Sequence, residues 1–588
     1  MNCKTVAYLV AGLLIVCCTT PQTGPDRIVT NPIDLNYAFH TPDNPSDTSQ
    51  KRSGVREAAD PVCVLFKGNY YLFASKSNGY WSSSDMQNWV FIETDVLPLE
   101  HYAPTSMEYD GELYWMTSDI NCLYKTATPE DGSSWQLVTD HLTPFPDRPD
   151  VAGHDPDIFA DEDNRVYLFW GCSNVDNIYG IELDPKNNFA SIGGPEVLIT
   201  HNKDIYGWER RGDLNDIEEE GWNEGPSMIK HNGRYYLQYA SPGTQFDSYG
   251  DGLYVSDSPL GPYTHIEASP MSIKPGGWMT GAGHGDTFED KYGNLWHVAS
   301  TVISHRMSFE RRIGFFPVFF TASGNMYALT DFSDSPIILP DSKVDFEHSA
   351  PWTGWMELGR KGTASASSSA PGKEAGKAND NSIKTLWSAE SGEAGEWLCI
   401  DLGTNAEVNA VQTNFADDGF GFYDPEKAKS PYKYVVEHSR DGKNWKVLFD
   451  RRDNSTDNPH TLLVADKAVK ARYIRISNLA SLDGNFSIFD LRIFGNAKGG
   501  LPAEPTGLKA SRSAGGRTIS FTWDETPGAD AYILRWGVRE DEMYFTCECD
   551  SNSKQLGLFS AGTSYYFTVD AFNTYGITRG KTIHHVSK

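Results

Sequence analysis

The feature that most constrains this chain is a short segment that recurs five times in its first half. Each copy leads through an Asp/Asn/Gly turn into an aromatic run, which is the pattern of a β-hairpin. The copies recur about every 43 to 69 residues, a period typical of propeller blades. They read "DPVCVLFKGNYYLFA" at 60–74, "APTSMEYDGELYWMT" at 103–117, "HDPDIFADEDNRVYLFWG" at 154–171, "GPSMIKHNGRYYLQY" at 225–239 and "GHGDTFEDKYGNLWHVA" at 283–299. The repeat predicts an all-β chain that begins with a five-bladed β-propeller over about 30–340.

The residues that open the five copies should meet at one end of the propeller axis, because the first strand of each blade runs along the central channel. Three of these five residues are acids: the set is Asp60, Ala103, Asp155, Glu224 and His284. Proline follows both Asp60 and Asp155. Since proline restricts the residue before it, we predict an extended backbone that directs the Asp155 side chain.

Three converging carboxyl groups suit the cleavage of a glycosidic bond. One protonated carboxyl protonates the leaving oxygen, and one carboxylate activates water or attacks directly. A third acid can raise the pKa of the proton donor and orient it. Asp60, Asp155 and Glu224 supply these groups from three blades. Asp157 competes with Asp155, because residues two apart on a strand face the same side, but Asp155 shares with Asp60 the position before proline.

From about residue 55 to 330 the chain resembles glycoside hydrolase family 43. The motifs that carry the resemblance are "AADPVCVLFKGNYYLFAS", "HDPDIFADEDNRVYLFWG", "NEGPSMIKHNGRYYLQYAS" and "GHGDTFEDKYGNLWHVAS". The resemblance implies that Asp60 is the general base, that Asp155 orients and tunes the acid, and that Glu224 is the general acid. It also implies an inverting enzyme, whose base and acid carboxyl groups lie about 6.5–9.5 Å apart.

The expected substrate is a neutral plant-type polysaccharide or oligosaccharide, from which the enzyme removes α-L-arabinofuranosyl units. A β-xylosidase or a β-galactosidase-like activity on the same fold is the alternative, because pocket shape sets the sugar. A non-catalytic glycan-binding propeller is a further alternative. A binding module needs no set of three converging carboxyl groups, which argues against it.

The same resemblance implies further roles around the pocket. His284 would hold a calcium or other ion in the channel, with waters completing its shell, because one histidine is a poor calcium ligand. No organic cofactor is expected. Arg312 is the arginine expected to reach the sugar, with Arg311 and Arg306 as alternatives. Contacts with the substrate are also predicted for Tyr102, Trp208, Trp222 and His305.

The rest of the chain divides into two smaller β domains. Residues 355–497 resemble a discoidin-type jelly roll, in the segments "EWLCIDLG", "YKYVVEHSRDGKNW" and "IFDLRIFG". Residues 503–588 resemble a fibronectin type III sandwich, with "AYILRWG" and "TSYYFTVDAFNTYG" as core strands. Glycan binding by the jelly roll and simple structural support remain open alternatives.

The beginning of the chain is typical of an export signal. Lys4 precedes an apolar run that is too short to span a membrane, and Cys17 and Cys18 follow it. We expect a lipoprotein signal over 1–18, lipidated at either cysteine, and a bacterial cell-surface or periplasmic location; simple secretion is the alternative. The net charge of −29 disfavours nucleic acid and anionic membrane surfaces, so membrane contact is expected only through the lipid anchor. A monomer is expected.

Overall fold

The computed structural model describes residues 27–39, 55–140, 142, 144–145, 153–303, 306–420 and 431–587. Strands make up nearly all of the regular structure in these ranges, which confirms the predicted all-β class. The helical segments there are short 3-10 turns, η1 (Pro185–Asn187), η2 (Gly207–Glu209) and η3 (Ala375–Asn379). The proposed signal over 1–18 lies outside the described residues.

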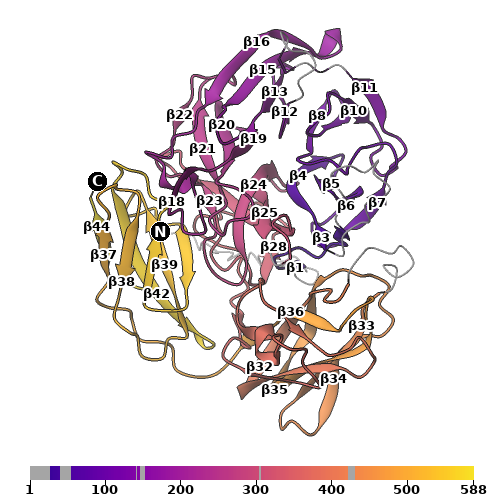
Figure 1. Cartoon of the computed structure of the whole chain (residues 1–588), viewed down its shortest axis with the longest axis vertical. Helices are drawn as coiled ribbons and strands as arrows, with labels where there is room; N and C mark the ends of the chain where they lie inside the picture. Colours follow the sequence, from indigo (N-terminus) through magenta and orange to yellow (C-terminus); the bar gives the residue numbers. More distant parts are fainter. Residues whose placement is uncertain are drawn as a thin grey trace, which may run out of the picture.

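Five antiparallel sheets, each built on four strands, surround one axis and form the predicted propeller (Figure 1). Blade one contains β4 (Ala59–Phe66), β5 (Asn69–Ser75), β6 (Gly79–Ser83) and β7 (Val90–Glu93). Blade two contains β8 (Thr105–Tyr109), β9 (Glu112–Met116), β10 (Leu123–Thr126) and β11 (Gln136–Thr139). Blade three contains β12 (Asp157–Ala160), β13 (Val166–Trp170), β15 (Ile178–Asp184) and β16 (Ala190–Ile199). Blade four contains β19 (Asn223–His231), β20 (Arg234–Ser241), β21 (Gly250–Ser256) and β22 (Thr264–His265). Blade five contains β24 (Thr280–Glu289), β25 (Leu295–Val302), β26 (Arg311–Phe320) and β27 (Met326–Ala328).

The five repeated segments form the two inner strands of the five blades. In blade three, all five residues of β13 are buried, because an aromatic run between neighbouring blades has apolar partners on both faces. Two short strands add to blade four, where β14 (Cys172–Ser173) pairs with β19 and β23 (Ser272–Ile273) pairs with β21. The repeat period therefore predicted the architecture correctly.

Strands from both ends of the propeller region lie together beside blade five. β1 (Arg27–Val29) pairs with β28 (Ile337–Leu339), and β2 (Ala38–Phe39) pairs with β3 (Arg56–Glu57). An insertion before blade four forms a further hairpin of β17 (Arg210–Arg211) and β18 (Ile217–Glu220).

The second domain is one eight-stranded sheet system, drawn in orange in Figure 1. Its strands are β29 (Met356–Glu357), β30 (Thr363–Ala366), β31 (Trp387–Ser388), β32 (Trp397–Phe415), β33 (Lys433–Ser439), β34 (Trp445–Arg451), β35 (His460–Ala480) and β36 (Ser487–Asn496). The domain is joined to the propeller by ion pairs of the buried Arg56. Arg56 donates from Nε to Asp417 across 2.7 Å and from Nη1 to Asp457 across 3.0 Å.

The third domain is a sandwich of two sheets. One sheet holds β37 (Lys509–Arg512), β38 (Ile519–Thr522) and β41 (Ser553–Leu556). The other holds β39 (Ala531–Gly537), β40 (Phe545–Cys549), β42 (Tyr565–Asn573), β43 (Gly576–Thr578) and β44 (His584–Val586). The two sheets fit a fibronectin type III domain, an assignment that stays a prediction.

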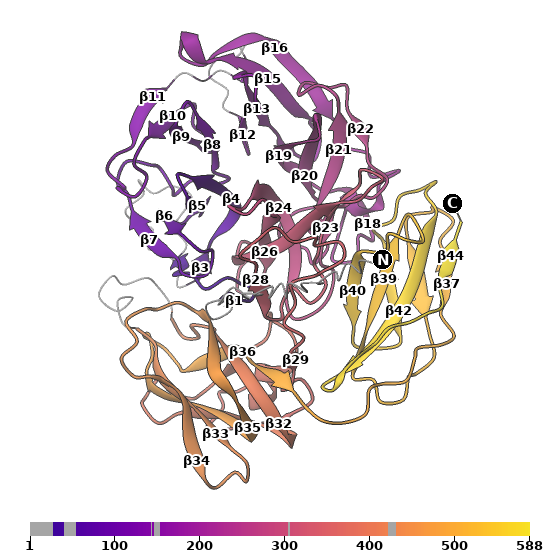
Figure 2. The same cartoon turned by 180° about the vertical axis from the view of Figure 1, so that it is seen from behind.

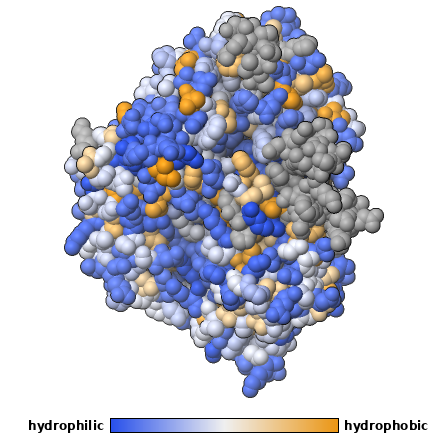
Figure 3. All heavy atoms as spheres, in the orientation of Figure 1, coloured by the Kyte–Doolittle hydropathy of each residue, from blue (hydrophilic) through white to orange (hydrophobic). Residues whose placement is uncertain are grey.

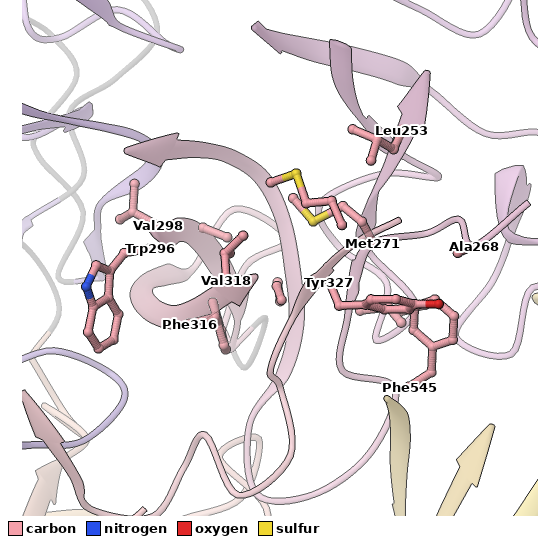
Figure 4. Close-up of a cluster of buried hydrophobic side chains, with 14 of the residues drawn as sticks. Leu253, Ala268, Met271, Trp296, Val298, Phe316, Val318, Tyr327 and Phe545 are labelled. Carbon is pink, nitrogen blue, oxygen red and sulfur yellow. The ribbon is translucent and has the colours of Figure 1, made fainter. Parts of the chain in front are cut away.

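This third domain packs against the propeller, and two of its contacts show how it is attached. The ring of Phe545 lies 5.1 Å from that of Tyr327, at the edge of a continuous apolar cluster (Figure 4). The domain also lies beside β18 of the insertion (Figure 2), where the Ala561 N–H donates to the Ile205 carbonyl across 2.7 Å. The insertion is therefore attached to the third domain on one side and leads into blade four on the other.

The surface is predominantly hydrophilic on the face shown in Figure 3, with apolar residues scattered over it. Among the residues that the structure describes, no helix is long and apolar enough to cross a membrane. Each of the six cysteines in the described ranges carries a free thiol.

Candidate active site

A cavity of about 450 Å³ opens where the inner strands of the blades begin. Its size lies within the range of small-ligand sites. The predicted residues Asp60, Asp155, Glu224 and His284 all line it. The other lining residues are Tyr102, Ser118, Asp119, His154, Cys172, Trp222, Gly243, Thr244, Gln245, Ser308, Phe309 and Arg311. Side chains that are far apart in the chain therefore face one space.

The backbone repeats one unusual conformation at the start of every blade. Asp60, Ala103, Asp155 and His284 each have φ of 48°, and Gly225 has φ of 55°. Positive φ is uncommon for residues other than glycine, and it clusters at functional sites. The prediction of an extended backbone at Asp155 is therefore wrong.

The strained residues are held by the neighbouring blade. The Asp60 N–H donates to Ser300 Oγ across 2.8 Å, and the Asp155 N–H donates to Ser118 Oγ across 2.7 Å. The His284 N–H donates to Asp251 Oδ1 across 2.8 Å. Hydrogen bonds between blades thus fix the backbone, which proline alone does not do. In blade four the equivalent position is Gly225, so Glu224 lies one residue before it.

Asp60 is held as a carboxylate. Arg311 Nη1 lies 2.8 Å from Asp60 Oδ1, and Ser75 Oγ donates to Asp60 Oδ2 across 2.6 Å. Burial alone would raise the pKa of this carboxyl. The Arg311 guanidinium and the His284 ring outweigh burial, so the pKa of Asp60 lies below its ordinary value. An ionised carboxylate is the form that a general base requires.

Glu224, in contrast to Asp60, is held as a protonated carboxyl group. Burial and repulsion by Asp155 raise the pKa of Glu224 to about 7. The Tyr249 hydroxyl donates to Glu224 Oε1 across 2.5 Å, which limits the increase. Near neutral pH this carboxyl therefore retains a proton that it can give to a leaving group. One cavity thus holds a carboxylate and a carboxylic acid, the division of roles that acid–base catalysis uses.

Asp155 lies between these two groups. Ser118 Oγ donates to its Oδ1 across 3.1 Å. Burial raises the pKa of Asp155, the His284 ring lowers it, and repulsion by Asp60 adds to the rise. Because Asp155 also raises the pKa of Glu224, it has the properties predicted for a residue that tunes the acid.

His284 contacts two of the acids. Its Nδ1 lies 3.3 Å from Asp60 Oδ1 and 3.9 Å from Asp155 Oδ2. Burial would lower the pKa of His284, but the surrounding carboxylates raise it. A protonated imidazole has no lone pair for a metal, and calcium prefers a shell of oxygen ligands. These residues fit an imidazolium better than a calcium ligand. The calcium that the family resemblance implies is not tested by the structure, and removal of metal ions from the protein tests it.

Asp157 lies outside the cavity lining, one step deeper along the channel. Its Oδ2 accepts from the Met228 N–H across 2.9 Å, and its Oδ1 accepts from Thr105 Oγ1 across 3.1 Å. Burial and the Asp286 carboxylate raise its pKa to about 8. It therefore links blades two, three and four, and the structure favours Asp155 over Asp157 at the cavity.

The arginine at the cavity is Arg311, not Arg312. Arg312 is buried on the other side of β26, where Nη1 donates to the Arg56 carbonyl across 2.8 Å and Nε lies 3.0 Å from His460 Nε2. The choice of Arg312 is corrected for a simple reason, since neighbouring residues of a strand face opposite sides. Arg306, the other alternative, lies outside the lining and is paired with Glu310.

Some of the predicted aromatic contacts line the cavity and others do not. Tyr102 and Trp222 line the cavity, and Trp222 is 42% exposed. Trp208, in the insertion, is fully buried against Tyr239 of blade four and is absent from the lining, so its prediction as a substrate contact is corrected. His305 lies outside the described residues.

Cys172, Thr244, Gln245 and Phe309 are among the lining residues that were not predicted. The Tyr249 hydroxyl, which contacts Glu224 directly, was not predicted either. These residues occupy loops or strands outside the repeated motif, so the repeat carried no signal for them.

The chain matches two known domain families. The profile described as "Glycosyl hydrolases family 43" matches residues 55–326, and the profile described as "F5/8 type C domain" matches residues 363–489. A solved structure described as "Glycoside hydrolase" aligns with a TM-score of 0.45 at 20% identity, over 75% of this chain and 99% of that chain.

Among curated proteins, the chain is similar to the Beta-D-galactofuranosidase xynD of Aspergillus niger, with 26% identity over 298 residues, 44% of this chain and 79% of that protein. It is 27% identical over 159 residues to the Xylosidase/arabinosidase of Butyrivibrio fibrisolvens, covering 25% of this chain and 26% of that protein. It is 34% identical over 108 residues to the Lactadherin of Rattus norvegicus, covering 17% of this chain and 24% of that protein. The chain thus spans about a quarter of each of the last two proteins.

The profile matches confirm the resemblances to family 43 and to the discoidin-type domain. The chain is therefore an enzyme acting on O-glycosyl bonds that carries a glycosyl hydrolases family 43 domain, followed by an F5/8 type C domain.

Proposed function

We propose that the protein is an inverting glycosidase that removes α-L-arabinofuranosyl units from neutral polysaccharide or oligosaccharide side chains. The observation that carries the proposal is the pair of opposite pKa shifts in one cavity, lowered at Asp60 and raised at Glu224. Two carboxyl groups whose pKa values are driven apart are the acid and the base of a hydrolytic site.

In the proposed reaction, Asp60 accepts a proton from a water molecule as the water oxygen attacks the anomeric carbon. Glu224 gives its proton to the glycosidic oxygen as that bond breaks. The products are a free sugar of inverted configuration and an alcohol. Asp60 is left protonated and Glu224 ionised, and exchange of protons with water restores both groups.

Arg311 and His284 assist by keeping Asp60 ionised before the reaction. Asp155 contributes by keeping the proton on Glu224, since repulsion by its carboxylate raises the pKa of Glu224. Trp222 and Phe309, each 42% exposed at the cavity, offer apolar faces for a sugar ring.

The names of two relatives support the proposed class of substrate. One is named a β-D-galactofuranosidase and the other a xylosidase/arabinosidase. α-L-Arabinofuranose and β-D-galactofuranose have the same ring configuration and differ in the exocyclic arm. β-D-Galactofuranosidase activity is therefore the second candidate, and β-xylosidase activity the third.

The predicted lipoprotein export, the bacterial surface location and the monomeric state are part of the same proposal, as is exo action. An exported enzyme would meet polysaccharide outside the cell. The F5/8 type C domain and the third domain are proposed to support the propeller, to which both are attached by buried contacts.

The test is a panel of 4-nitrophenyl glycosides, carrying α-L-arabinofuranosyl, β-D-galactofuranosyl and β-D-xylopyranosyl groups. We expect the first to be cleaved fastest, with the released sugar inverted when it is followed by NMR. Glu224→Gln and Asp60→Asn should each lower kcat by about 10²–10⁴-fold. Normal turnover by either variant, or a retained anomeric configuration, would contradict the proposed roles.

A further inference from the structure

A cysteine lies beside the proposed acid. After β13, the chain leaves blade three at Gly171 and forms β14, which pairs with β19 of blade four. In this pairing Cys172 is directly opposite Glu224. Residues directly opposite in an antiparallel pair have neighbouring side chains, so the crossing strand brings the thiol to the carboxyl group.

The thiol contacts the Oε2 oxygen of Glu224. Cys172 donates from Sγ to Glu224 Oε2 across 3.4 Å, while the Tyr249 hydroxyl donates to Oε1. Sγ of Cys172 and one carboxylate oxygen each of Asp155 and Glu224 lie within 4.8 Å of one another. The thiol therefore occupies the space between the two acids and lines the cavity.

We propose that Cys172 is a positioning residue that keeps the proton of Glu224 available on Oε2, by offering this oxygen only a weak hydrogen-bonding partner. The inference rests on the proposed role of Glu224 as the general acid.

The two oxygens of the Glu224 carboxyl group have different partners. Because Oε1 already accepts a short hydrogen bond from Tyr249, the acidic proton resides on Oε2. Oε2 has a hydrogen-bonding contact with the sulfur of Cys172. Sulfur is a weak acceptor and the thiol a weak donor, so the proton is not held in a strong internal hydrogen bond.

A serine hydroxyl at this position would act differently. It would accept the proton of Oε2 strongly, and it would also donate strongly to the ionised carboxylate. Either bond would have to break before Oε2 could reach a glycosidic oxygen. The weak thiol contact avoids this cost while it fills the space between Asp155 and Glu224.

The surrounding charges keep the thiol neutral. Burial raises the pKa of Cys172 well above its ordinary value, and the Asp155 and Glu224 carboxylates raise it further. A neutral thiol adds no negative charge to a cavity that Asp60, Asp119, Asp155 and Glu224 already line. It therefore does not act as a nucleophile or as a further base.

The test measures how the rate depends on the leaving group. It uses aryl glycosides of the sugar that wild type cleaves best, one with dinitrophenol and one with unsubstituted phenol as leaving group. Dinitrophenol departs without protonation, whereas phenol needs the proton of the acid. We expect Cys172→Ser to lower kcat/KM about tenfold on the phenyl glycoside and less than about twofold on the dinitrophenyl glycoside.

Two controls isolate the effect of the hydroxyl group. Cys172→Ala removes the thiol without adding a hydrogen-bonding group, and it should stay within about threefold of wild type on both substrates. Cys122→Ser makes the same chemical change at a half-buried cysteine of blade two, outside the cavity lining, and should leave both rates unchanged. Thermal unfolding of each variant shows whether it is folded.

The outcomes distinguish the role of Cys172 from the role of Glu224. Equal losses on both leaving groups, or equal rates for folded Cys172→Ser and Cys172→Ala on the phenyl glycoside, would overturn the role of Cys172. Neither result alters the role of Glu224. Normal turnover of the phenyl glycoside by Glu224→Gln would instead overturn the proposed function itself.

Discussion

Asp60 and Arg311, which are 251 residues apart in the chain, form a buried ion pair with 2.8 Å between Oδ1 and Nη1. Arg311 is held from its other side by Glu57, whose Oε1 lies 2.7 Å from Nη2. The last blade thus supplies the cation that keeps the first blade's carboxyl group ionised. The pairing ties closure of the propeller ring to the state of the proposed base.

Removal of this cation should impair the base. We expect Arg311→Met to lower kcat/KM by about tenfold or more, because burial would then raise the pKa of Asp60. The acidic limb of the pH–rate profile should move to higher pH. Arg306→Met, in the same segment but outside the cavity lining, should change the rate less than about threefold. A larger effect at Arg306 than at Arg311 would contradict the assignment.

The alkaline limb should report Glu224. The site needs Asp60 ionised and Glu224 protonated, so activity should be high below pH 7 and fall as Glu224 loses its proton near its pKa of about 7. Tyr249→Phe removes a hydrogen bond that lowers the pKa of Glu224, and the limb should move to higher pH. Tyr239→Phe, at a buried tyrosine bonded to Glu209 instead, is the matched control. If the alkaline limb does not move in Tyr249→Phe, a group other than Glu224 titrates there.

The stability of the fold should depend on the same carboxyl. The pKa of Glu224 is higher in the folded protein than in the unfolded chain, so the folded state binds the proton more tightly. The stability that this tighter proton binding contributes is fully present below about pH 4.5. It is lost as the pH rises through about 7, where the folded protein releases the proton. Glu224→Gln should therefore raise Tm relative to wild type more at pH 8 than at pH 4, as measured by calorimetry. An equal change at both pH values would show that the carboxyl is not buried as described.

His284 should act through its own charge. We expect His284→Asn to lower kcat/KM by about tenfold, because the ring cation lowers the pKa of Asp60. Treatment with EDTA should leave the activity of wild type unchanged. A reversible loss restored by calcium would favour the metal role that the family resemblance implied.

The repeated motif made much of the fold predictable. Period, turn residues and aromatic strands indicated five blades, and the blade-opening positions indicated Asp60, Asp155 and His284. Each of these depends on local pattern, which the chain repeats. Glu224 was also predicted at the site, although it lies one residue before the repeated position that Gly225 holds.

Side-chain direction within strands was harder to predict. Arg311 and Arg312 are adjacent, and a shift of one residue in register exchanges the face that points to the cavity. Trp208 and Trp222 belong to one insertion, yet the first is buried and the second is 42% exposed. Nothing in the local sequence distinguishes the members of either pair.

The amino-acid sequence by itself determined the all-β class, the five blades and the three acids, because hairpin periodicity and residue type are local properties. Only the tertiary structure decided which arginine faces Asp60, that Tyr249 and Cys172 contact Glu224, and that His284 lies between two acids. These relationships arise between blades, where strands distant in the chain are brought together by packing around one axis. The charge state of each acid depends on those neighbours, so it could not be read from the residues alone.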